Sequence, residues 1–126
     1  MSAAETLRVM LVEDHIAFRQ ALAFLLSHNS DLEVVAQAGS LAEAREALLE
    51  EHVDVAVVDL GLPDGDGREL FGELRRTNPD ISVVVLSATV EAGHLEEVLK
   101  AGADAVLDKV ESPPTIAEQV RHVAGR

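Results

Sequence analysis

Three carboxylates, one hydroxyl and one lysine follow four separate hydrophobic runs of this chain. The runs are residues 8–12, 53–58, 83–86 and 105–107, and the polar residues that follow them are Glu13, Asp14, Asp59, Ser87 and Lys109. If the runs are parallel strands of one sheet, these side chains meet at one edge. Carboxylates gathered there repel one another unless a cation lies among them. The lysine and the hydroxyl suggest a phosphoryl group as a further ligand.

Each of these residues has a plausible chemical role. Glu13 and Asp14 form a donor pair suited to Mg²⁺, which prefers oxygen ligands and keeps several waters. Asp59 ends the most hydrophobic strand and is a candidate nucleophile that can form an acyl phosphate. Ser87 can donate its hydroxyl to a phosphoryl oxygen, and Lys109 offers a compact positive charge. Taken singly, each has a simpler interpretation: Asp14 caps a helix, and the others are solvated or end a strand.

The elements that would position these residues alternate as five strand–helix pairs. The expected strands are residues 7–12, 32–39, 53–60, 81–87 and 103–109, and the expected helices are residues 15–29, 40–51, 68–78, 91–100 and 115–123. Ser40 and Glu43 form a capping box for the second helix, and Gly102 is the expected stop of the fourth. Val-rich runs without strict alternation indicate strands covered on both faces. They predict an α/β fold with a doubly wound parallel sheet.

The distribution of polar residues predicts the strand order 2-1-3-4-5, a flavodoxin-like (βα)5 arrangement. Ligands of doubly wound sheets bind beyond the carboxyl ends of the strands, where the strand order reverses. The second strand ends in residues 38–40 and contributes no ionisable group, as expected of a strand outside that point. The first and third strands, which end at Glu13 and Asp59, flank it.

Composition restricts the class of protein. The 126 residues predict one domain, 1–126, with an aliphatic core, because 48% are hydrophobic and the only aromatic residues are three Phe. The absence of cysteine excludes disulfides, zinc–thiolate sites and cysteine nucleophiles. No signal-peptide pattern and no apolar run of ~20 residues is visible, so we expect a cytoplasmic protein without a membrane span. The net charge of −13 disfavours direct binding to nucleic acid.

Two further patterns are weak. Residues 62–73 nearly match a calcium-binding loop, with Asp64, Asp66 and Glu73 at suitable offsets. The first ligand position is Leu62, however, where a carboxylate is required, so an EF-hand is rejected. The histidines lack metal-ligand spacing, and we interpret them as surface or core residues. They are His15, His28, His52, His94 and His122.

From about residue 7 to residue 123, the sequence resembles the receiver domain of two-component response regulators. The matching segments are VEDH (12–15), DLGLPDGDG (59–67), LSA (86–88) and AGADA (101–105), which leads to Lys109. As an ordered set, these segments are highly specific.

The resemblance implies a role for each site residue. Asp59 would accept a phosphoryl group from a sensor histidine kinase. Asp14, Asp59 and the Gly61 carbonyl would bind Mg²⁺, with Glu13 acting through water. Ser87 would contact the phosphoryl group, and Lys109 would pair with Asp59 and then with the phosphate.

The resemblance also implies what the protein does more broadly. It implies a signalling phosphoacceptor and not an enzyme, capable at most of phosphorylating itself from small donors and of dephosphorylating itself. Residues 59–67 are similar to those of regulators with a C-terminal helix-turn-helix domain, so transcription would be controlled by a DNA-binding domain that this chain lacks. A homodimer is a further expectation.

Two residues depart from the family pattern, and two other functions compete with this interpretation. Val106 stands where the family usually has Tyr or Phe, which puts the usual aromatic switch in doubt, and Val110 follows Lys109 where Pro or a small polar residue is frequent. One competing function is a haloacid-dehalogenase-like phosphatase. Such enzymes require a second Asp two residues after the nucleophile, where this chain has Gly61. The other is a receiver-like interaction module that no longer uses phosphate.

Overall fold

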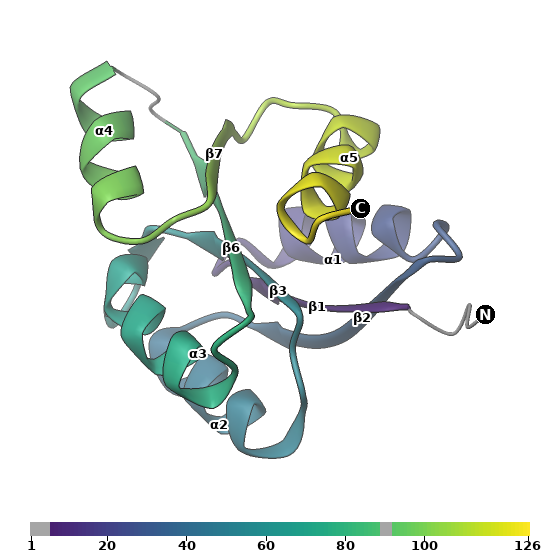
Figure 1. Cartoon of the computed structure of the whole chain (residues 1–126), viewed down its shortest axis with the longest axis horizontal. Helices are drawn as coiled ribbons and strands as arrows, with labels where there is room; N and C mark the ends of the chain where they lie inside the picture. Colours follow the sequence, from purple (N-terminus) through teal and green to yellow (C-terminus); the bar gives the residue numbers. More distant parts are fainter. Residues whose placement is uncertain (1–5, 89–91) are drawn as a thin grey trace.

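A computed structural model describes residues 6–88 and 92–126 and shows a five-stranded parallel sheet between two layers of helices (Figure 1). The strands are β1 (Leu7–Val12), β2 (Leu32–Ala38), β3 (Val55–Asp59), β6 (Ser82–Ser87) and β7 (Ala105–Asp108). Their order is β2-β1-β3-β6-β7, and all four neighbouring pairs are parallel. The predicted order 2-1-3-4-5 and the doubly wound, flavodoxin-like fold are confirmed.

The helices divide between the two faces of the sheet (Figure 1). They are α1 (Ile16–Leu26), α2 (Leu41–Glu50), α3 (Phe71–Thr77), α4 (Ala92–Lys100) and α5 (Pro113–Val123). Residues of α2, α3 and α4 share one buried cluster with Met10 and Val12, whereas α1 and α5 pack on Val9 and Leu11. Successive strand residues point to opposite faces of the sheet, so each continuous apolar run contributes side chains to both hydrophobic clusters. Within the described ranges, no helix has the length and apolar character needed to cross a membrane.

The helix boundaries correct one prediction and refine others. Asp14 does not cap α1: the N-cap position is His15, whose side chain makes no capping hydrogen bond. The Ser40 cap of α2 is confirmed, because its hydroxyl accepts the Glu43 N–H at 3.1 Å. The Glu43 carboxylate, however, accepts from the Gly39 N–H at 2.6 Å, one residue away from the capping-box partner. Residue 91, the predicted start of the fourth helix, lies outside the described residues.

The segment after β3 forms a small hairpin that we did not predict. Strands β4 (Gly61–Leu62) and β5 (Gly65–Asp66) pair antiparallel, and a 3₁₀ turn (Gly67–Leu70) precedes α3. Asp64 at the hairpin tip accepts hydrogen bonds from the N–H groups of Leu41 at 2.8 Å and Ala42 at 3.1 Å. The hairpin is therefore tied to the N-terminus of α2.

Other residues of the rejected calcium loop also have partners. Leu62 is buried, Asp66 pairs with Arg68 at 2.7 Å, and Glu73 accepts from Arg45 at 3.0 Å. These contacts are incompatible with carboxylates that converge on one calcium ion, so the structure agrees with the rejection. Gly102, with φ of +122°, ends the turn after α4 as predicted.

Candidate functional site

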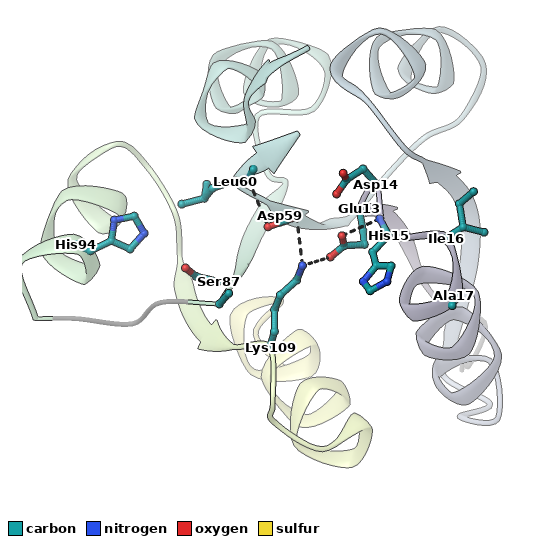
Figure 2. A pocket seen from close by; sticks show the side chains of 12 residues that line it. Glu13, Asp14, His15, Ile16, Ala17, Asp59, Leu60, Ser87, His94 and Lys109 are labelled. Carbon is teal, nitrogen blue, oxygen red and sulfur yellow. Dashed lines mark hydrogen bonds and ion pairs between the residues drawn. The ribbon is translucent and has the colours of Figure 1, made fainter. Parts of the chain in front are cut away.

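A cleft of about 840 Å³ opens at the carboxyl ends of β1, β3 and β6 (Figure 2). All six residues that the sequence analysis singled out line it: Glu13, Asp14, Asp59, Gly61, Ser87 and Lys109. In the pairing of β1 with β3, Val12 lies opposite Val58. The next residues along each chain segment, Glu13 and Asp59, therefore lie at the same edge of the sheet. The fold thus brings together side chains up to 96 positions apart in the sequence.

Three carboxylates converge in this cleft. Glu13, Asp14 and Asp59 each offer one oxygen, and these three oxygens lie within 4.8 Å of one another. Glu13 is only 4% exposed and Asp59 only 9%, whereas Asp14 is exposed. Two of the three negative charges are thus largely removed from water, which is unfavourable unless a positive charge compensates them.

Lys109 brings a positive charge to the two buried carboxylates. Its Nζ lies 2.7 Å from Oε1 of Glu13 and 3.3 Å from Oδ2 of Asp59 (Figure 2). The Lys109 N–H donates to the Ser87 carbonyl at 3.0 Å, which fixes the start of the lysine side chain beside β6. The Lys109–Asp59 pair that the resemblance implied is present, but the ammonium lies closer to Glu13.

Burial and pairing act in opposite directions on the pKa values of Glu13 and Lys109. Burial raises the pKa of Glu13 above its ordinary value, although the hydrogen bonds from Lys109 and from the His15 N–H, at 3.0 Å, oppose this rise. For Lys109, burial acts to lower the pKa, but Glu13 and Asp59 together outweigh it and raise the pKa. The Glu13 shift thus follows mainly from burial, and the Lys109 shift follows from two carboxylates beside one ammonium group.

The donor set fits a hard divalent cation. The clustered donors are oxygens, the site has excess negative charge, and the cleft leaves room for waters. Mg²⁺ takes such ligands and retains part of its water shell. Gly61 lines the same cleft beside Asp59, and its N–H lies 3.4 Å from Oδ1 of Asp59.

Two neighbours of the site were not predicted from the sequence. His94, interpreted only as a surface or core residue, comes from α4 and lines the cleft (Figure 2). Phe18 on α1 lies beneath the Lys109 ammonium, with 5.4 Å from Nζ to the ring centroid. Neither residue belongs to a motif, and only the position of Phe18 one turn into the helix after Asp14 could have indicated it. Val106 is half-buried in β7 and packs against the cluster that contains Met10.

Comparisons with known proteins agree with this geometry. Residues 9–121 match the family described as the response regulator receiver domain. The chain is 37% identical over 120 residues to the DNA-binding transcriptional activator DevR/DosR of Mycobacterium tuberculosis, covering 94% of this chain and 55% of that protein. It therefore spans about half the length of this relative.

Two solved structures are similar as well. The signal receiver domain of the putative response regulator NarL from Mycobacterium tuberculosis superposes with a TM-score of 0.87 at 29% identity, covering 96% of this chain and 98% of that one. A response regulator from Burkholderia pseudomallei, with a phosphorylated aspartic acid, calcium ion and citrate, has a TM-score of 0.83 at 25% identity, covering 94% and 69%. The chain belongs to the family of response regulator receiver domains.

Proposed function

We propose that this receiver domain accepts a phosphoryl group on Asp59 from a sensor histidine kinase, in a reaction that depends on Mg²⁺. One observation carries the proposal: the nearly buried Asp59 carboxylate ends the central strand, 3.3 Å from the Lys109 ammonium and beside two more carboxylates. The phosphorylated aspartic acid of the Burkholderia regulator supports the same chemistry.

The transfer exchanges one bond to phosphorus for another. A carboxylate oxygen of Asp59 bonds to the phosphorus of a phosphohistidine, while the phosphorus–nitrogen bond breaks and its electron pair leaves with the imidazole, which takes up a proton. Such transfers depend mainly on positioning and charge neutralisation. Lys109 neutralises charge on the attacking Asp59 carboxylate and then on the phosphoryl group, and Ser87, which lines the same cleft, donates its hydroxyl to a phosphoryl oxygen.

Asp14, Asp59 and the Gly61 carbonyl would hold Mg²⁺, with Glu13 acting through a water. When bound, the ion would neutralise charge on the carboxylates and on the transferring phosphoryl oxygens. The three clustered carboxylate oxygens support this assignment.

The wider biological role is part of the same proposal. The domain, residues 1–126, is a phosphoacceptor in signal transduction and not a turnover enzyme, and it controls a DNA-binding output domain outside this chain. The relative DevR/DosR, a DNA-binding transcriptional activator about twice as long, supports that arrangement. With a net charge of −13, this domain itself makes no direct contact with nucleic acid. A homodimer and a cytoplasmic location stay predictions.

Intact mass tests the proposal directly. The wild-type protein is incubated with acetyl phosphate in Mg²⁺ or in EDTA at matched ionic strength, beside Asp59→Asn and the control Asp80→Asn. Asp80 is exposed and lies away from the cleft. We expect one phosphoryl group on the wild type and on Asp80→Asn in Mg²⁺, and none on Asp59→Asn or in EDTA.

Two other results would favour the competing functions. If no adduct forms and beryllofluoride also fails to bind, the domain is a phosphate-independent interaction module. Continuous turnover of a generic phosphomonoester would indicate a phosphatase, although Gly61 offers no second carboxyl group for that reaction.

A further inference from the structure

The Lys109 ammonium has a third neighbour besides its two carboxylates. Nζ lies over the ring of Phe18, 5.4 Å from the centroid, within the range in which the face of an aromatic ring attracts a cation. The lysine side chain is 22% exposed, so this contact is partly removed from water. The ring and the carboxylates of Glu13 and Asp59 all contact the one ammonium group.

The lysine needs such support because its stem is flexible. Four carbons separate the ammonium from the backbone, and the side chain lines an open cleft. Transfer to Asp59 requires the charge in one place, since misplacement of a catalytic group by about 1 Å slows reactions strongly. A ring face at this distance attracts the ammonium and so disfavours rotamers that carry it away from Glu13 and Asp59.

The ring is itself held from the other side. Phe18 packs against the core between α1 and α5 and lines a small apolar groove of about 90 Å³ with Leu22, Pro113 and Ile116. It therefore stands between this groove and the acidic cleft. A leucine at position 18 would keep apolar packing against the groove but would offer Lys109 no ring face.

We propose that Phe18 is a positioning residue for Lys109: its ring holds the ammonium between Glu13 and Asp59 and so accelerates phosphorylation of Asp59. The proposal rests on the proposed function, and it assigns to this position of α1 a role that packing alone does not require. Phe24 on the same helix offers a matched control, because it is 66% exposed and packs on His28.

The test compares rate constants of phosphorylation by acetyl phosphate in Mg²⁺. Phe18→Leu slows the reaction about two- to fivefold, the range that corresponds to an exposed or partly buried cation–π contact. Phe18→Tyr, which keeps the ring face, retains the wild-type rate, and so does Phe24→Leu. Wild-type speed in Phe18→Leu, or equal slowing in Phe18→Leu and Phe18→Tyr, would overturn the proposal.

A second measurement does not depend on phosphorylation. It is a double-mutant cycle of Phe18→Leu and Lys109→Met in EDTA. We expect the effect of the double mutation on the unfolding equilibrium constant to differ about two- to fivefold from the product of the two single effects. Independent effects would overturn the contact. If the wild type is not phosphorylated but the cycle shows coupling, the proposed function fails while the contact between Phe18 and Lys109 stands.

Discussion

Carboxylates gather at both ends of the parallel strands, but they are paired in different ways. At the amino ends, Asp54 accepts the Arg8 N–H at 2.9 Å and Asp104 accepts the Val83 N–H at 2.7 Å. Each of these carboxylates bonds to a backbone group of a neighbouring strand. At the carboxyl ends, two of the three clustered carboxylates, those of Glu13 and Asp59, share the ammonium of Lys109.

The pKa shifts at the two ends have opposite signs. Asp31, just before β2, accepts from Arg121 at 2.6 and 3.0 Å, and this guanidinium holds the pKa of Asp31 below its ordinary value. At the other end, burial raises the pKa of Glu13. The paired Asp31 therefore stabilises the fold when ionised, whereas burial of ionised Glu13 reduces stability, and the crowded carboxylates around Glu13 are available to bind a cation.

The largest expected effect follows from removing the shared lysine. Lys109→Met should slow phosphorylation by acetyl phosphate about a hundredfold, because a charge aimed at the transferring group is lost. Arg121→Met, at the amino ends, removes a cation that is paired with Asp31 and should leave the rate unchanged. Intact-mass time courses measure both variants. Similar slowing in the two would contradict the proposed difference between the amino and carboxyl ends of the strands.

The next effect concerns stability and lies at the amino ends. Asp104→Ala leaves the buried Val83 N–H and the Arg75 guanidinium without this acceptor, so the free energy of unfolding should fall by about 2 kcal/mol. Asp14→Ala, which removes one of the crowded charges, should not destabilise the metal-free protein. Urea denaturation in EDTA compares them, and an equal loss in both variants would contradict the account.

A smaller gain is expected when the nucleophile is neutralised. Asp59→Asn relieves repulsion among the three carboxylates, so in EDTA the free energy of unfolding should rise by about 1 kcal/mol. Mg²⁺ should then stabilise this variant less than the wild type, because one ligand has lost its charge. Strong destabilisation of Asp59→Asn in EDTA would refute the repulsion argument.

The smallest effect is a difference in pH dependence, below about 1 kcal/mol for each group. Because the pKa of Glu13 is raised by folding, its ionisation lowers stability as pH rises from its ordinary value of 4.5 through the raised value. Glu13→Gln should flatten that slope in EDTA. The pKa of Asp31 is lowered by folding, so ionised Asp31 stabilises the protein. This stabilisation is fully present above the ordinary value of 3.8 and is lost as pH falls through the lowered value. Asp31→Asn should remove this loss at acidic pH, and urea midpoints measured against pH check both variants.

A large part of the fold followed from the sequence because the signals are local or repeated. Apolar runs predicted the strands, and the absence of ionisable groups after the second strand indicated the strand order. The same reasoning brought Asp59 and Lys109 to one edge, because parallel strands all end there.

What the sequence did not indicate depends on contacts between distant segments. For Asp14 the sequence allowed two positions, a helix cap or the acidic cluster, and only the folded chain distinguishes them: Asp14 lies in the cluster and His15 is the N-cap. Asp64 bonds to α2, 22 and 23 residues away, and no local pattern indicates that partner. The approach of Lys109 to Glu13 and Phe18 depends on how α1 and the β7–α5 segment pack, which the order of residues does not specify.

We propose that, of the three crowded carboxylates, Asp59 is the one that takes the phosphoryl group. Borohydride reduction after incubation with acetyl phosphate and Mg²⁺ converts an aspartyl phosphate to homoserine, which peptide mass spectrometry locates. We predict homoserine at position 59 alone, and none when Mg²⁺ is replaced by EDTA. Homoserine at position 14, a reduced glutamyl group at position 13, or no reduced residue in Mg²⁺ would contradict the account.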